Sequence, residues 1–232
     1  MGTPILLGLD GGGIRTFGKY IAKENMKIYT HPIIIPYNIS SKFQIGAIGM
    51  FVNKNFERIN SQSGIGDASL FAKYQVYQKD GKGKTFRLIT KLNQVFPTGK
   101  ASSMPPIGSN AWQTQLGLVS GYVTLKYGLY AELAYTFTTN GLPDNFIYNI
   151  AFVYPLLPQK YPPKQVNLNI GFNGNYLSSI NRNTIFMSSG VQLIVGKKIL
   201  FETGIQLPLI ENVPNTQKTK FIYTLGTRVL LF

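Results

Sequence analysis

The sequence predicts an all-β protein, an antiparallel transmembrane β-barrel of twelve strands. Stretches of alternating side-chain character recur along all 232 residues, and charged residues make up only 14% of the chain, against about 25% in soluble domains. No stretch approaches the roughly 18 apolar residues that a membrane-spanning helix needs. Because only helices and closed barrels satisfy their backbone hydrogen bonds in lipid, a membrane-spanning form of this chain must be a barrel.

The predicted strands are alternating runs that are separated by turn-forming residues. Each run is long enough to cross a membrane, for which a tilted strand needs about 9–11 residues. The number of runs is even, as is usual in single-chain bacterial barrels. The runs cover 12–22, 26–37, 42–52, 66–79, 84–97, 111–124, 127–138, 145–156, 165–174, 184–196, 198–208 and 218–232.

The alternation is clearest in two of these runs. One face of the run at 165–174 carries Val166, Leu168, Ile170 and Phe172, and the opposite face carries Gln, Asn and Gly. In the run at 66–79 we expect one face to carry Ala68, Leu70, Ala72, Tyr74 and Val76, and the other Asp67, Ser69, Phe71, Lys73, Gln75 and Tyr77. Successive side chains of a strand point to opposite faces, so each strand has an apolar and a polar surface. A soluble β-sandwich would show the same alternation.

Three features favour the membrane barrel over the sandwich. The polar faces are rich in Asn, Gln, Gly and Thr rather than in charge. Bulky aromatics lie near the ends of the runs, where interfacial girdles form: Tyr77, Phe86, Phe96, Trp112, Tyr122, Phe146 and Tyr154. Short links (38–41, 80–83, 125–126, 197) alternate with mostly longer ones (53–65, 98–110, 139–144, 175–183, 209–217), although 23–25 and 157–164 break this rule. We therefore expect both termini on the periplasmic side.

The whole chain, 1–232, is expected to form one outer-membrane domain in which residues 1–11 are a flexible lead-in. Residues 1–9 lack the basic region of a secretory signal peptide, and Asp10 with the glycines at 11–13 interrupts the apolar stretch. The final Phe232 on an alternating strand resembles the sorting signal of outer-membrane barrels, while Arg228 stands where that signal usually has an apolar residue. A bulge or an inward-facing Arg228 would explain the departure, and a buried strand ending in Phe is the alternative.

The net charge of +14 is spread along the chain without a dense basic cluster or helix. This distribution does not suit nucleic-acid binding. Basic turns, such as the one carrying Lys79, Lys82 and Lys84, could instead meet anionic headgroups. We therefore expect outer-membrane lipid and lipopolysaccharide as partners in the bacterial outer membrane, and no nucleic acid.

No catalytic residue, metal site or cofactor is predicted. The motif LDGGGIR at 9–15 resembles the oxyanion-hole segment of patatin-like lipases and the phosphate loop of sugar kinases, but Thr16 replaces the last patatin glycine. No serine lies in the G-x-S-x-G elbow that the lipase chemistry needs. His31 is the only histidine and precedes Pro32, so we expect a structural role for it. One histidine, no cysteine and nine scattered carboxylates do not suit a metal site.

If the apolar faces point to lipid, several charged side chains point into the lumen. The candidates for lining a solute path are Asp67, Lys73, Arg87, Lys91, Glu132, Glu202 and Arg228. A basic residue that faced lipid at mid-bilayer would cost about 2–4 kcal/mol, which favours this orientation. The same residues could line an open path with a cationic bias or fill the lumen with stabilising ion pairs, and both alternatives remain open.

One part of the chain resembles a known family. The stretches GIGDASLFAKYQVYQ and KTFRLITKLNQVFPTG, within 64–99, are similar to transporter-like outer-membrane proteins of the phenol meta-cleavage pathway. The shared residues are Gly64, Gly66, Asp67, Lys73, Tyr74, Pro97, Thr98 and Gly99, and the preceding stretch 33–52 resembles the family's second hairpin. The resemblance implies import of small, often hydrophobic compounds and no reaction.

The function expected from the sequence is passive passage of small solutes, including hydrophobic or aromatic ones. The alternative is a non-conducting structural barrel that anchors or surrounds other envelope proteins. A third hypothesis, the patatin-like lipase, rests only on the glycine motif at 9–15.

Overall fold

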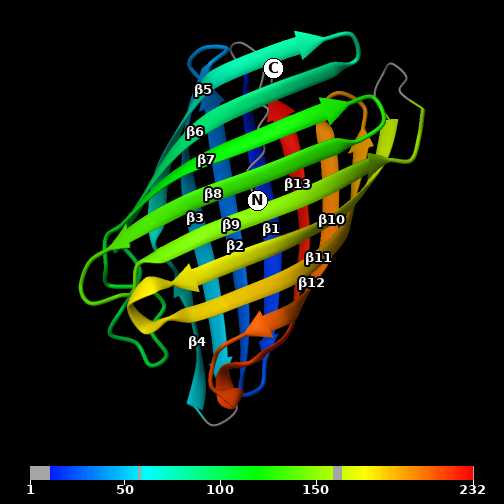
Figure 1. The fold of residues 1–232 in the computed structure, drawn as a ribbon. Coiled ribbons are helices and arrows are strands. Elements are labelled where there is room, and N and C mark those ends of the chain that lie inside the picture. Colours follow the sequence, from blue (N-terminus) through cyan, green and yellow to red (C-terminus); the bar gives the residue numbers. More distant parts are fainter. Residues whose placement is uncertain (1–10, 57–58, 159–163, 232) are drawn as a thin grey trace.

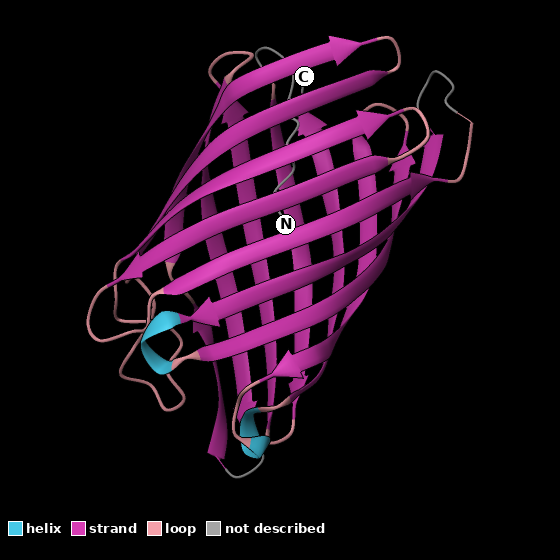
Figure 2. Cartoon of the chain, in the orientation of Figure 1, coloured by secondary structure: helices cyan, strands magenta, loops and turns pink. Residues whose placement is uncertain are grey.

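A computed structural model describes residues 11–56, 59–158 and 164–231. Almost all of these residues lie in antiparallel strands that wrap into a tilted cylinder (Figure 1). Two short 3-10 helices, at Ser178–Ile180 and Asn215–Gln217, lie in links between strands at one end of the cylinder (Figure 2). Within the described part of the chain, no helix is both long and apolar enough to cross a membrane.

The strands follow one another along the chain, and consecutive strands pair with each other, except that β4 and β5 both pair with β3. Their bounds are β1 Gly12–Lys23, β2 Met26–Asn38, β3 Phe43–Phe56, β4 Ile59–Ile65, β5 Ala68–Gly81, β6 Lys84–Phe96, β7 Gln113–Thr124, β8 Gly128–Thr138, β9 Asn145–Pro155, β10 Lys164–Leu177, β11 Arg182–Val195, β12 Ile199–Glu211 and β13 Thr219–Leu231.

The barrel closes because β1 pairs with β13 on one side and with β2 on the other. The strand β3 pairs with β2 along its whole length, with β5 through 43–48 and with β4 through 51–56. Because β4 and β5 pair with different parts of β3, they follow each other along the same edge of β3 and count as one strand of the barrel. The thirteen described strands therefore form a closed twelve-stranded antiparallel barrel, which confirms the predicted fold class and strand number.

The prediction of a long loop at 53–65 was wrong. In the structure β3 continues to Phe56, and β4 pairs back onto it from Ile59 to Ile65. This hairpin extends beyond the neighbouring strands at the loop end of the barrel (Figure 1). The segment INSQSGI has few apolar residues, so it lacks the one-sided pattern that identifies a strand in contact with lipid or a core.

The outer surface of the cylinder is apolar, and the inner surface is predominantly polar. Outward side chains such as Leu70, Leu116, Ile150 and Leu207 are about half exposed. Inward positions include the buried Gln44, Gln75, Glu132 and Thr136. An apolar exterior around a polar lumen is the arrangement of a transmembrane barrel and the reverse of a soluble sandwich.

Aromatic side chains form contacts near both ends of the barrel. At the end with the short turns, Tyr77 contacts Phe86, and Tyr127 contacts Tyr122 and Phe152, with ring centroids 6.0–6.2 Å apart. At the loop end, the pairs are Phe96–Trp112 at 5.3 Å, Tyr135–Phe137 at 4.8 Å and Phe146–Tyr148 at 6.0 Å. Their positions agree with two interfacial girdles.

The expected inward position of Tyr77 was wrong. A register shift lies between Gln75 and Tyr77, where Gln75 pairs with Ile89 but Tyr77 pairs with Leu88. Such a bulge inserts one extra residue, so every following side chain changes face. Tyr77 is consequently 47% exposed and contacts Phe86 on the outside of the barrel.

The two ends of the described chain meet in the barrel wall. Gly12 is the partner of Leu231, and the carbonyl of Gly11 accepts a hydrogen bond from the amide of Asn38 at 3.0 Å. Most of the predicted lead-in, residues 1–10, and Phe232 lie outside the described residues. The start of β1 and the end of β13 therefore lie at the same end of the barrel, the one with mostly short turns.

Candidate functional site

One ion pair spans the wall formed by β6, β7 and β8. The Lys91 Nζ atom lies 2.8 Å from Glu132 Oε1, and Asn149 donates to Glu132 Oε2 at 3.1 Å. The strand β7 lies between the two charged residues, and Gly117 is the β7 partner of Lys91. Since Gly117 has no side chain, the lysine can cross β7 on the lumen side and reach the carboxylate.

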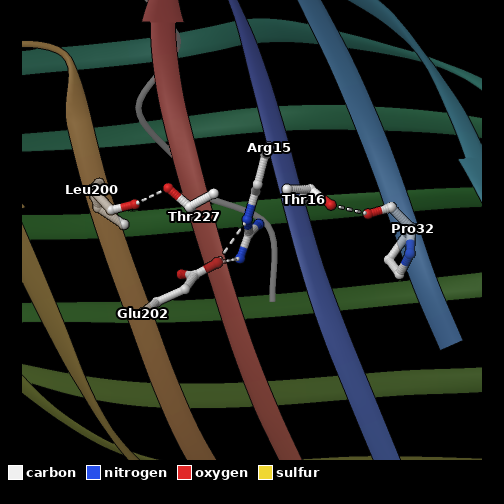
Figure 3. A network of polar contacts seen from close by, with 6 residues as sticks. All are labelled: Arg15, Thr16, Pro32, Leu200, Glu202 and Thr227. Carbon is white, nitrogen blue, oxygen red and sulfur yellow. Dashed lines mark hydrogen bonds and ion pairs between the residues drawn. The ribbon is translucent and has the colours of Figure 1, made fainter. Parts of the chain in front are cut away.

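A second ion pair spans β13 in the same way. The Arg15 guanidinium of β1 donates from Nε and Nη2 to Glu202 Oε1 of β12, at 2.9 and 2.6 Å (Figure 3). Gly226 of β13 is the direct partner of Glu202. Each ion pair thus crosses one strand and has a glycine beside one of its members.

Both ion pairs lie beside a second, like-charged residue. Lys73 is the direct cross-strand partner of Lys91, and Arg228 is the direct partner of Arg15. Like charges directly opposite each other are destabilising in a sheet. Arg228 pairs with Leu200 and Arg15 without a register shift, so no bulge lies at this position. The predicted inward position therefore explains why a charged residue stands here in the last strand.

The Lys73 side chain lies over an aromatic ring on the lumen side. Its Nζ atom is 5.4 Å from the centroid of Phe71, a distance at which a cation is attracted to the ring. Phe71 in turn covers Gly46, where an added Cβ would lie 2.4 Å from the ring. Because Lys73 is the cross-strand partner of Lys91, it lies beside the ion pair of Lys91 and Glu132.

Arg87 belongs to a different part of the lumen, toward the turn between β5 and β6. It donates to Gln75 Oε1 at 3.5 Å, and Gln75 donates to Gln78 Oε1 at 2.6 Å. Gln78 then donates to Asp80, which also accepts from Thr85. Arg87 therefore ends a polar chain at the turn end of the barrel and lies apart from the group around Lys73.

Asp67 lies at the junction of β4 and β5, where it fixes the link at 97–112. Its Oδ1 accepts from the Gly99 amide and its Oδ2 from the Ser109 amide, each at 2.8 Å. Thr98 Oγ1 accepts from the Ala68 amide at 2.9 Å. Asp67, Thr98 and Gly99 carry the resemblance to the family, and in the structure they join the loop to the barrel wall.

The other motifs considered in the sequence have positions in the wall. Gly12 and Gly13 of the glycine triplet pair with Leu231 and Leu230, whereas Leu9 and Asp10 lie outside the described residues. On the outer face, the His31 ring forms hydrogen bonds with the hydroxyl of Thr16 at 2.7 Å and with the hydroxyl of Tyr29 at 3.0 Å. Among the described residues no group of three His, Cys, Asp or Glu side chains is placed to hold a metal.

Sequence reasoning missed Arg15 and Lys19 as lumen residues. Both lie on the same face of β1 as Phe17, whose ring centroid is 5.1 Å from the Arg15 Cζ atom. The signal was present, because Arg15, Phe17 and Lys19 alternate with Thr16 and Gly18.

Comparison with known proteins identifies similar sequences and folds. The model of a family described as "Putative MetA-pathway of phenol degradation" matches residues 27–223. No curated protein matches the chain significantly.

Three solved structures share the barrel fold. An outer membrane channel from Pseudomonas putida F1 is 12% identical, with a TM-score of 0.79 over 100% of this chain and 99% of that one. The KdgM porin in complex with disordered oligogalacturonate is 9% identical, with a TM-score of 0.57 over 93% and 98%. The β domain of the Bordetella autotransporter BrkA is 13% identical, with a TM-score of 0.53 over 94% and 98%. At these identities the likeness establishes the fold alone.

Proposed function

Because this chain belongs to the phenol MetA-pathway family, whose model covers 27–223, we propose that it is a channel for small solutes, including hydrophobic or aromatic ones. The observation that carries the proposal is the closed twelve-stranded barrel with an apolar exterior and charged residues in its lumen. Passage is passive. The chain supplies a path and no chemical step.

The charges on the inner wall support a path for solute. Exposing basic groups to lipid costs about 2–4 kcal/mol each at mid-bilayer, so their side chains are directed inward. About eight strands already enclose a lumen that side chains fill, and twelve enclose a wider one. Lys73, Lys91, Glu132, Glu202 and Arg228 line this path, while Arg87 belongs to the turn end and Asp67 holds the loop.

The same surface features support a location in the bacterial outer membrane. The apolar exterior and the aromatic contacts at both ends match a lipid-spanning band. Exposed turn lysines such as Lys82, Lys126 and Lys198 would meet phospholipid or lipopolysaccharide headgroups. These features support lipid as the principal partner of the barrel.

Planar-bilayer recording combined with flux of phenol into liposomes tests this function. We expect the purified chain to give discrete conductance steps and to accelerate phenol entry relative to protein-free vesicles. Heat-modifiable migration on a gel provides the control for folding. A folded, inserted barrel that neither conducts nor passes phenol would support the alternative, a structural barrel that anchors other envelope proteins.

A further inference from the structure

We propose that the lysines at the end of the barrel with the short turns form a binding surface for the headgroups of anionic phospholipids such as phosphatidylglycerol. The inference rests on the proposed function, in that it takes the chain as an outer-membrane barrel, and it names the lipid partner of one end. It begins from the places that lysine occupies in the fold.

Every link at this end of the barrel carries or adjoins a lysine. The links join β2 to β3, β5 to β6, β7 to β8, β9 to β10 and β11 to β12. Because they connect every second pair of neighbouring strands, they are distributed around the rim of the closed barrel (Figure 1). The exposed lysines in and beside these links, called the turn-end lysines below, are Lys42, Lys79, Lys82, Lys84, Lys126, Lys164, Lys197 and Lys198.

The two ends of the barrel differ in their balance of charge. Among the described residues, the turn-end lysines are accompanied by a single carboxylate, Asp80, which accepts hydrogen bonds from Gln78 and Thr85. The loop end mixes both signs, with Lys23, Lys27, Lys54, Lys100, Arg182, Lys218 and Lys220 beside Glu24, Asp67, Asp144 and Glu211. The described part of the turn end therefore has the larger excess of positive charge.

The turn-end lysines lie where lipid headgroups meet the barrel. Lys79 is the cross-strand partner of Phe86, and the ring of Phe86 contacts Tyr77 on the outside of the barrel. Lys84 precedes Phe86 by two residues. Aromatic contacts of this kind mark the membrane interface, and lysine side chains next to them extend their ammonium groups toward the headgroups. This position beside the aromatic girdle favours a lipid over an acidic protein as the partner.

The expected orientation of the barrel decides which lipid the turn-end lysines meet. The short turns share their end with the start of β1 and the end of β13, which we expect on the periplasmic side. The periplasmic leaflet of a bacterial outer membrane consists of phospholipid, whereas lipopolysaccharide occupies the opposite leaflet. One lysine near an anionic membrane surface raises the affinity about fivefold. A rim of such lysines should therefore prefer anionic headgroups to zwitterionic ones.

Native mass spectrometry of the full chain in detergent, titrated with phosphatidylglycerol or with phosphatidylcholine, measures this preference. We expect phosphatidylglycerol to bind about tenfold more tightly or better. A variant that combines Lys42→Gln, Lys82→Gln, Lys126→Gln and Lys198→Gln should lose most of the preference, because it removes one cation from each of four turns. Arginine at the same positions keeps the charge and should retain the preference.

The matched control removes the same charge from the loop end. It combines Lys23→Gln, Lys27→Gln, Lys100→Gln and Lys218→Gln, and it should bind phosphatidylglycerol like the wild type. Equal losses in the two variants would reduce the effect to net charge and overturn the proposal. Purified lipopolysaccharide is the third probe. If the turn-end variant loses lipopolysaccharide binding and keeps phosphatidylglycerol binding, the assignment to phospholipid is wrong.

Channel recordings separate this inference from the proposed function. Heat-modifiable gel migration first establishes that each variant is folded. In phosphatidylcholine bilayers the turn-end variant should conduct like the wild type, because the exchanged lysines are exposed at the rim and do not line the lumen. Conductance without any preference for phosphatidylglycerol would overturn the lipid surface alone. A preference for phosphatidylglycerol without conductance or phenol flux would overturn the channel alone.

Discussion

Arg15 of β1 and Arg228 of β13 are direct cross-strand partners on the lumen side of the barrel. Their repulsion is offset by Glu202, which accepts two hydrogen bonds from Arg15 and lies opposite Gly226, two residues from Arg228. This seam joins the first and last strands of the barrel. One carboxylate therefore stabilises the place where the barrel closes.

Glu202→Gln should lower the free energy of unfolding by about 1–3 kcal/mol, because it leaves two partly buried guanidinium groups without a counter-charge. Urea unfolding in detergent or lipid, followed by heat-modifiable gel migration, measures this loss. Glu24→Gln is the matched control. Its partner Lys220 lies 3.1 Å away, and both side chains are about half exposed, so the loss there should not exceed about 1 kcal/mol. Equal losses at the two positions would contradict the role of Glu202.

Gly226→Ala should destabilise the same seam by steric crowding. An added Cβ would lie 2.5 Å from Phe17 Cβ and 2.8 Å from the Thr16 carbonyl oxygen. Overpacking of this kind costs about 1–3 kcal/mol. Gly49→Ala serves as the control, because an added Cβ there meets nothing within 4 Å. The same urea measurements compare the free energies of unfolding of the two variants. Equal stability of Gly226→Ala and Gly49→Ala would contradict the predicted crowding.

The sequence was sufficient to predict the strands that contact lipid, because a one-sided apolar pattern marks each of them. It failed at the hairpin of β3 and β4, whose residues 59–65 lack such a pattern, and at Tyr77, where a bulge reverses the alternation. Bulges and pairing beyond the apolar band depend on neighbouring strands and leave little local trace.

Alternation in the sequence suggests inward positions for several charges, although Arg15 and Lys19 were missed, and the grouping of the charges could not be predicted. Lys91 and Glu132 are 41 residues apart, and Arg15 and Glu202 are 187 apart. Their contacts depend on the register of the intervening strands and on the two glycines, Gly117 and Gly226. A single sequence gives inward positions through alternation, whereas register comes from the pairing of whole strands.

Asp67→Ala should release the link at 97–112 from the barrel wall. The carboxylate accepts the Gly99 and Ser109 amides, so its removal leaves both donors without this partner. We expect trypsin to cut after Lys100 about tenfold faster in the variant, since proteolysis follows the population of the opened loop. Asp67→Asn retains a carbonyl acceptor and should give an intermediate rate. An unchanged rate in the alanine variant would show that the loop is held by other contacts.

Asp144, in the loop between β8 and β9, should give that loop a dependence on pH. The Thr138 amide donates to Oδ1 at 2.7 Å and holds the pKa of the carboxyl below its ordinary value, and hydrogen bonds from the Thr138 and Tyr135 hydroxyls act in the same direction. A lowered folded-state pKa means that the carboxylate stabilises the loop above the ordinary carboxyl pKa. This contribution is lost as the pH falls through the lowered value.

An NMR titration of the Asp144 carboxyl carbon should show a midpoint below that of an exposed aspartate. The Thr138 amide shift should follow the same midpoint and should stop titrating in Asp144→Asn. A midpoint at or above the ordinary value, or a Thr138 shift that still titrates in the variant, would contradict this role of Asp144.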